Sequence, residues 1–179
     1  MISVACDLLG AALSERIGLV RDTISNLAAG EWDILSDLGI YAFVVGVLAV
    51  TIGLVRWRVS RWDWRLGTVL LVVLALDYTL IAAYEAYSTG EGMQIHYKLV
   101  YLMGVAFPLT VLLTAGQFYE IDRRLGTALY IGGIVCALAA PFLFVVPTGW
   151  DGLYERALAF GKLGWFVTMG VMVWRDPDI

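Results

Sequence analysis

The chain has 179 residues, of which 60% are hydrophobic and 16% are charged, with a formal net charge of −4 at pH 7. A soluble domain is nearer half apolar and a quarter charged, so this composition excludes that class and indicates an integral membrane protein. The negative charge is spread along the chain and forms no basic patch, so nucleic acid is not an expected partner.

Residues 1–30 have the pattern of an amphipathic helix. Apolar side chains such as Leu9 and Leu13 recur at intervals of three and four residues, and ionised side chains such as Asp7 and Arg16 fall between them. Because charges are costly to place in hydrocarbon, we expect this helix to lie at the membrane interface or against a partner. The alternative, that this segment crosses the membrane, stays open.

Five apolar stretches follow, each close to the roughly 20 residues that a helix needs to cross a bilayer. They cover residues 38–55, 66–84, 99–119, 125–150 and 157–174. We therefore predict an all-α membrane protein: a five-helix transmembrane bundle over residues 31–179, preceded by the interfacial helix of residues 1–30. Pro108 and Pro141 are expected to bend the third and fourth spans, since proline removes a backbone donor.

Basic residues are unevenly distributed between the two sides of this bundle. Seven lie on one side, namely Arg56, Arg58, Arg61, Arg65, Arg123, Arg124 and Arg175, against four on the other. The positive-inside rule then places the N-terminus outside the cell membrane and the C-terminus in the cytoplasm.

Small residues repeat every seven positions on two spans. They are Gly39, Gly46 and Gly53 on the first span, and Gly126, Gly133 and Ala140 on the fourth. Such stripes let helix backbones approach closely in lipid. We expect them to pack helices within the bundle; the alternative is an interface with a second copy or another membrane protein.

Two ionisable residues lie inside predicted spans. At 1.5 Å per residue, Asp77 is about 12 Å inward from Glu85, and Lys162 is about 9 Å inward from Arg156, so their depths are similar. Buried charges usually pair, which predicts an Asp77–Lys162 ion pair, and a transport or proton-relay role is a further hypothesis. Alternatively, Lys162 extends outward along its stem, and Asp77 is protonated or bound to a neighbouring hydroxyl.

The single histidine, His96, is predicted at the outer mouth of the third span, as a pH sensor or as an interfacial hydrogen-bonding residue. Glu155 and Arg156 open the fifth span on the same side. The candidate polar cluster comprises Asp77, Glu85, His96, Glu155, Arg156 and Lys162.

Three short features together resemble one known family. Ser36-Asp37-Leu38-Gly39 precedes a glycine-bearing span, His96 opens a later span, and Glu155-Arg156 precedes a span containing Trp165. Over residues 34–174 this layout resembles the prokaryotic six-helix membrane proteins of domain-of-unknown-function family nine-nine-eight. The resemblance implies a further span before the Ser-Asp-Leu-Gly run, where this chain has its amphipathic segment. It also makes Asp37, His96 and Glu155 the positions to test, and it supplies no reaction.

The sequence contains no HExxH, GxSxG, P-loop or GxGxxG motif, so we assign no catalytic residue, metal or cofactor. We predict a non-catalytic membrane protein, either an accessory subunit of a membrane assembly or a small transporter-like or ligand-binding bundle. The alternative is a membrane enzyme acting on a lipid or quinone at the outer face, with His96 and Glu155 as acid–base groups.

Overall fold

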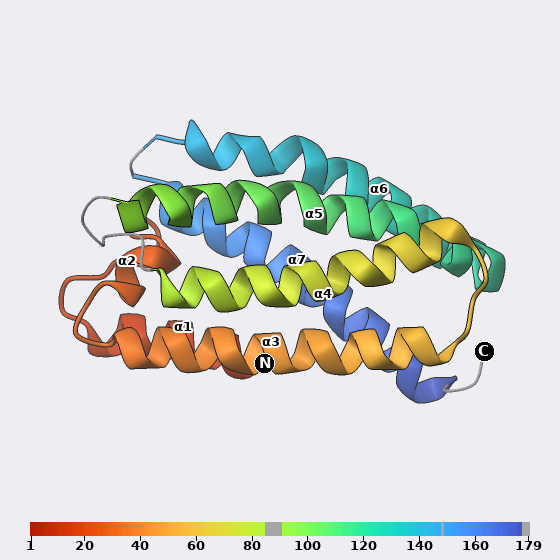
Figure 1. Ribbon diagram of the computed structural model, residues 1–179. Coiled ribbons are helices and arrows are strands. Elements are labelled where there is room, and N and C mark those ends of the chain that lie inside the picture. The colour runs from red at the N-terminus through yellow and green to blue at the C-terminus, as the bar shows by residue number, and fades with distance from the viewer. Residues whose placement is uncertain (85–90, 148, 177–179) are drawn as a thin grey trace.

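The computed structural model describes residues 1–84, 91–147 and 149–176, with the backbone alone for residues 91–94. Within these residues, every regular element is a helix. The elements are α1 (Ile2–Leu13), α2 (Ile24–Ala28), α3 (Asp33–Arg56), α4 (Trp62–Ala83), α5 (Glu91–Ile121), α6 (Arg123–Ala139), the 3-10 helix η1 (Ala140–Phe144) and α7 (Asp151–Arg175). Figure 1 shows the long helices side by side, with α7 crossing obliquely behind the others.

Across the described ranges, five helical segments are long and apolar enough to cross a membrane: α3, α4, α5, α6 with η1, and α7. The predicted all-α, five-helix membrane fold is thereby confirmed. Pro141 coincides with the change from α-helix to 3-10 helix, and helix ends at Phe144 rather than at residue 150. Pro108 lies within α5, which continues to Ile121.

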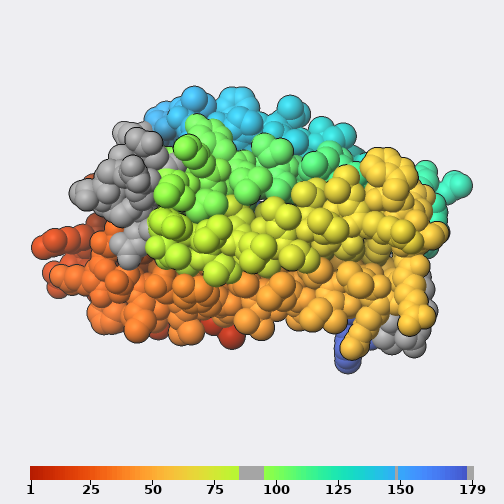
Figure 2. Space-filling view, in the orientation of Figure 1, coloured from red at the N-terminus to blue at the C-terminus, as the bar shows by residue number. Residues whose placement is uncertain are grey.

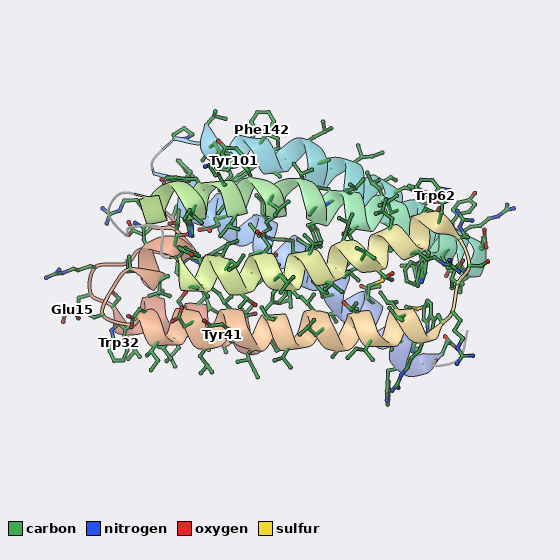
Figure 3. The ribbon with its side chains drawn as sticks, viewed as in Figure 1. Glu15, Trp32, Tyr41, Trp62, Tyr101 and Phe142 are labelled. Atoms are coloured by element: carbon green, nitrogen blue, oxygen red, sulfur yellow. The ribbon has the colours of Figure 1, made fainter. Side chains whose placement is uncertain are left out.

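The outward surface of these helices is covered by large apolar side chains. Val105 is 66% exposed and Trp62 73%, and Figure 3 shows Trp62 and Phe142 pointing away from the bundle. Figure 2 shows α3, α4 and α5 with α6 forming one continuous face. A soluble protein rarely exposes so much contiguous apolar surface, whereas lipid tails cover it without cost.

The N-terminal segment forms two short helices, which corrects the prediction of one amphipathic helix over residues 1–30. α1 ends where Ser14 becomes extended, and α2 begins at a capping box in which Thr23 and Asn26 bind each other's backbone N–H groups. α1 packs along α3, and the N-terminus lies near the middle of α3 in Figure 1. The segment is therefore part of the bundle.

One end of the bundle is closely packed; it carries the α3–α4 loop, the α5–α6 turn and the end of α7, and we call it the arginine end. The rings of Trp57 and Trp64 stack at 5.6 Å between centroids, and each lies 5.7 Å from the ring of Phe118. The opposite end, which carries α2 and the start of α7, we call the α2 end.

Glycines allow several of the close helix contacts. A Cβ atom would lie 2.2 Å from Val173 at Gly53, 2.3 Å from the Tyr119 backbone at Gly126 and 2.8 Å from Leu112 at Gly133. Gly39 faces Ser3 and Cys6 of α1, Ala140 lies beside Gly104, and no atom lies within 4 Å of the corresponding position at Gly46. Apart from Gly46, the two stripes lie at contacts inside one chain.

We expect Gly126→Ala to lower stability by about 1–3 kcal/mol, because the added methyl group overlaps the Tyr119 backbone. Gly46→Ala is the matched control, since that position is open and alanine favours a helix. Thermal unfolding of the purified variants in mild detergent measures both. Equal melting temperatures for the two variants would contradict this account of the stripes.

Candidate functional site

A cavity of about 680 Å³ occupies the α2 end of the bundle. Its walls come from α3 as far as Phe43, α4 from Tyr78 onward, α5 as far as Leu112 and α7 as far as Leu163. Because successive spans run in opposite directions, these half-helices meet at one end. The bundle is therefore packed at the arginine end and hollow at the α2 end.

Three aromatic side chains, Phe43, Tyr78 and Phe107, line the inner end of this cavity, and we call them its floor. The ring of Phe43 lies edge-on to Tyr78 at 5.0 Å and to Phe166 at 5.1 Å. Phe107 lies 5.8 Å from Trp165, again edge-on. These contacts separate the cavity from the packed arginine end.

Arg156 holds the N-terminal segment against α7. Its guanidinium is buried and binds the Asp7 carboxylate twice, from Nε to Oδ2 and from Nη2 to Oδ1, each at 2.9 Å. Its Nη1 donates to the carbonyls of Leu19 at 2.9 Å, Asp22 at 2.7 Å and Gly152 at 3.3 Å. All three guanidinium nitrogens thus have acceptors, as a buried cation requires.

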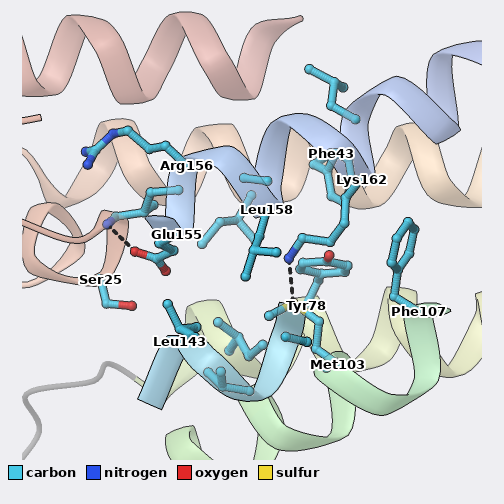
Figure 4. A pocket seen from close by; sticks show the side chains of 18 of the residues that line it. Ser25, Phe43, Tyr78, Met103, Phe107, Leu143, Glu155, Arg156, Leu158 and Lys162 are labelled. Carbon is cyan, nitrogen blue, oxygen red and sulfur yellow. Dashed lines mark hydrogen bonds between the residues drawn. The ribbon is translucent and has the colours of Figure 1, made fainter. Parts of the chain in front are cut away.

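The residues beside Arg156 make further contacts with the same segment. Glu155 Oε2 accepts a hydrogen bond from the backbone N–H of Ile24 at 2.6 Å, drawn as a dashed line in Figure 4. A Cβ atom at Gly152 would lie 2.3 Å from the Asp22 carbonyl oxygen. Glycine at position 152 is therefore what allows the loop before α2 to reach α7.

The loop itself is shaped by Asp22. The Gly18 N–H donates to its carboxylate at 2.8 Å, and Arg21 lies against the same oxygens. These two groups lower the pKa of Asp22, so its carboxylate is ionised at neutral pH. The turn that it closes presents the Leu19 and Asp22 carbonyls to Arg156.

His96 lines the cavity from α5 and is buried. Its Nδ1 lies 2.8 Å from the Tyr84 carbonyl oxygen at the end of α4. Because a carbonyl only accepts, Nδ1 carries the hydrogen in this contact, and a neutral ring keeps Nε2 as an acceptor.

Lys162 and Asp77 do not form the predicted ion pair. The Lys162 ammonium donates to Met103 Sδ at 3.2 Å and lies 5.7 Å from the centre of the Tyr78 ring. Both Asp77 oxygens are buried without a hydrogen-bond partner in the described part of the chain. The physical reason is that the two side chains point to different places, since Lys162 lines the cavity and Asp77 is not among its lining residues.

The structure brings five of the predicted site residues around one cavity: Asp37, His96, Glu155, Arg156 and Lys162. Asp77 lies beside it, and Glu85 falls outside the described residues. Within the described ranges, no three His, Cys, Asp or Glu side chains are grouped so as to hold a metal ion.

Sequence reasoning did not assign two further groups to the site, namely the Tyr78 hydroxyl and the Asp7 carboxylate. Asp7 carried a usable signal, because it is the one ionised side chain in the apolar stretch of α1 and therefore needs a partner. Nothing in the spacing of residues marked Tyr78.

A family model described as "Protein of unknown function (DUF998)" matches residues 1–172. No curated protein and no solved structure gave a match.

We expect Arg156→Met to destabilise the protein by about 3 kcal/mol or more, because it leaves the Asp7 carboxylate buried without its partner. Arg16→Met, which removes an exposed arginine from the same segment, is the control and should have no measurable effect. Thermal unfolding reports the difference, and limited proteolysis of residues 14–23 should become faster only in Arg156→Met. Indistinguishable variants would show that Arg156 does not anchor the segment.

Asp77→Asn should leave the melting temperature within about 2 °C of the parent protein or raise it, because neither carboxylate oxygen has a hydrogen-bond partner to lose. The substitution keeps the shape of the side chain and removes an ionisable group. A large fall in stability would instead reveal a stabilising interaction of the Asp77 carboxylate, with Lys162 as the first candidate partner.

Proposed function

This chain belongs to the family described as "Protein of unknown function (DUF998)", and we propose that it is a non-catalytic membrane protein whose cavity binds an amphiphilic, lipid-like molecule. The observation that carries this proposal is the cavity itself. Its volume falls within the roughly 300–1,000 Å³ of small-molecule sites. Its wall is mainly apolar, with a few charged and polar groups placed at defined points, and this combination suits a ligand with an apolar body and a polar head.

The distribution of basic residues supports an orientation for this site. Seven arginines lie at the arginine end, against four basic residues on the other side, so we place the arginine end in the cytoplasm of a cell membrane. The cavity then lies in the outer half of the bilayer. Its ligand would enter from the outer leaflet or from outside the cell.

A ligand-binding protein and a small transporter would both use this cavity, whereas an accessory subunit would not require one. We favour ligand binding because the glycine stripes, for which an external interface was the alternative to packing within the bundle, lie, Gly46 apart, at contacts within the chain. Purification of a stoichiometric membrane-protein partner would support the accessory subunit instead.

A membrane enzyme is the second candidate, favoured by one observation. His96 and Glu155 line the same cavity from different helices. The hydrogen bond of His96 is made by Nδ1 and that of Glu155 by Oε2. Nε2 of His96 and Oε1 of Glu155 are thus the atoms available for acid–base chemistry on a lipid or quinone. A lipid product that forms with the parent protein and not with a folded His96→Gln variant would favour the enzyme.

The experiment that tests ligand binding fills the cavity. Ala159 of α7 lines it, whereas Ala157 on the same helix is exposed and does not. We expect native mass spectrometry of the protein in mild detergent to show a co-purified lipid-like molecule in the parent and in Ala157→Trp. That molecule should be lost in Ala159→Trp, because the indole ring occupies its space. Absence of any bound molecule from the parent, together with no uptake of added hexadecanol, would refute the proposal.

A further inference from the structure

Three ionisable side chains on the α2 side of the cavity, Arg156, Glu155 and His96, already have protein partners. Arg156 is bound by Asp7 and three carbonyls, Glu155 accepts from the Ile24 N–H, and His96 binds the Tyr84 carbonyl. A ligand head group placed there would have to compete with contacts that hold the fold together. This side of the cavity is therefore a poor place for the ligand's charged group.

The floor of the cavity is different. Lys162 carries an ammonium with three donors, and its hydrogen bond among the described residues is to the Met103 sulfur, a weak acceptor. The Tyr78 side chain also lines the floor and is only 8% exposed, and its hydroxyl has no hydrogen-bond partner within the described chain. Figure 4 shows Lys162 reaching from α7 toward Tyr78 and Met103.

Buried polar groups without partners are costly, and a buried ammonium is more costly than a hydroxyl. Here a cation and a hydroxyl lie beside each other on the floor, with apolar wall between them and Glu155. Lys162 follows Glu155 by seven residues on α7, so the two sites are separated by roughly 10 Å along the helix. The arrangement provides donors at the floor and apolar surface above it.

We propose that Lys162 and Tyr78 form the head-group subsite of the cavity and bind the carboxylate of a long-chain carboxylic acid, whose apolar chain lies along the wall toward the α2 end. This inference rests on the proposed function and adds the ligand's class and direction. Charge-assisted hydrogen bonds from Lys162 Nζ and Tyr78 Oη to the two carboxylate oxygens would satisfy both side chains.

A carboxylate fits this subsite better than the other common head groups. An alkyl amine would bring a second cation next to Lys162. A phosphate presents more oxygens and more charge than one ammonium and one hydroxyl can satisfy, and phosphate sites usually include arginine or several backbone N–H groups. One cation beside one neutral donor matches a single negative charge.

Equilibrium binding of hexadecanoate, hexadecanol and hexadecylamine to the detergent-solubilised protein tests the inference, with empty micelles subtracted. These probes share one chain and differ in the head group. We expect the parent to bind hexadecanoate at least 10-fold more tightly than hexadecanol, and the amine most weakly. In Lys162→Met, hexadecanoate affinity should fall to that of hexadecanol, whose own affinity should stay within about 2-fold. Tyr78→Phe should weaken hexadecanoate binding about 3-fold or more, and Lys98→Met, which removes an exposed lysine outside the cavity, should change nothing.

The comparison of the three probes on the parent protein is itself a test of the carboxylate subsite, so the test does not depend on whether Lys162→Met folds. Equal affinity for acid and alcohol, or preference for the amine, would overturn the carboxylate subsite. If Ala159→Trp nevertheless abolished binding of these probes, the proposed ligand-binding function would stand. If none of the three probes bound the parent, the carboxylate subsite would fail, and the proposed function would fail with it if no molecule co-purified with the parent either.

Discussion

The position of the N-terminal segment depends on one buried guanidinium. Arg156 presents five N–H donors where water does not reach them, and donors in such a place need acceptors. Those acceptors are the Asp7 carboxylate, the Leu19 and Asp22 carbonyls and the carbonyl of Gly152. They come together only when α1 and the loop before α2 lie on α7. Since Ser3, Val4 and Ile24 then line the cavity, this single side chain also shapes the site.

The two ends of the bundle are packed by different means. At the arginine end, glycines and stacked aromatic rings bring the helices into close contact and leave little space. At the α2 end, α7 is held to the N-terminal segment by polar contacts, while its packing against α4 and α5 is sparse. A rigid end joined to a hollow end gives a cavity with a fixed floor, which is what a preorganised binding site needs.

Hydropathy alone predicted the five spans, because a bilayer allows few structures other than apolar helices of about 20 residues. The rise per residue predicted similar depths for Asp77 and Lys162, and the Lys162 ammonium lies 5.7 Å from the ring centre of Tyr78, the residue that follows Asp77. The direction of each side chain around its helix was not predictable, because packing decides it, so Lys162 meets Met103 and Tyr78 instead of Asp77. The break between α1 and α2 was equally hidden, since the group that binds the intervening loop lies far along the chain.

The ion pair between Asp7 and Arg156 joins residues that are 149 positions apart. At a synthesis rate of about 5–20 residues per second, the partner of Asp7 leaves the ribosome roughly 7 to 30 seconds after Asp7 itself. During that interval α1 has no cation to neutralise its carboxylate, and the loop before α2 has nothing to bind its carbonyls. α1 can pack along α3 as soon as both helices are made, but its carboxylate gains a partner only when α7 follows. Completion of α7 is thus the step that binds the loop before α2 and supplies the last wall of the cavity.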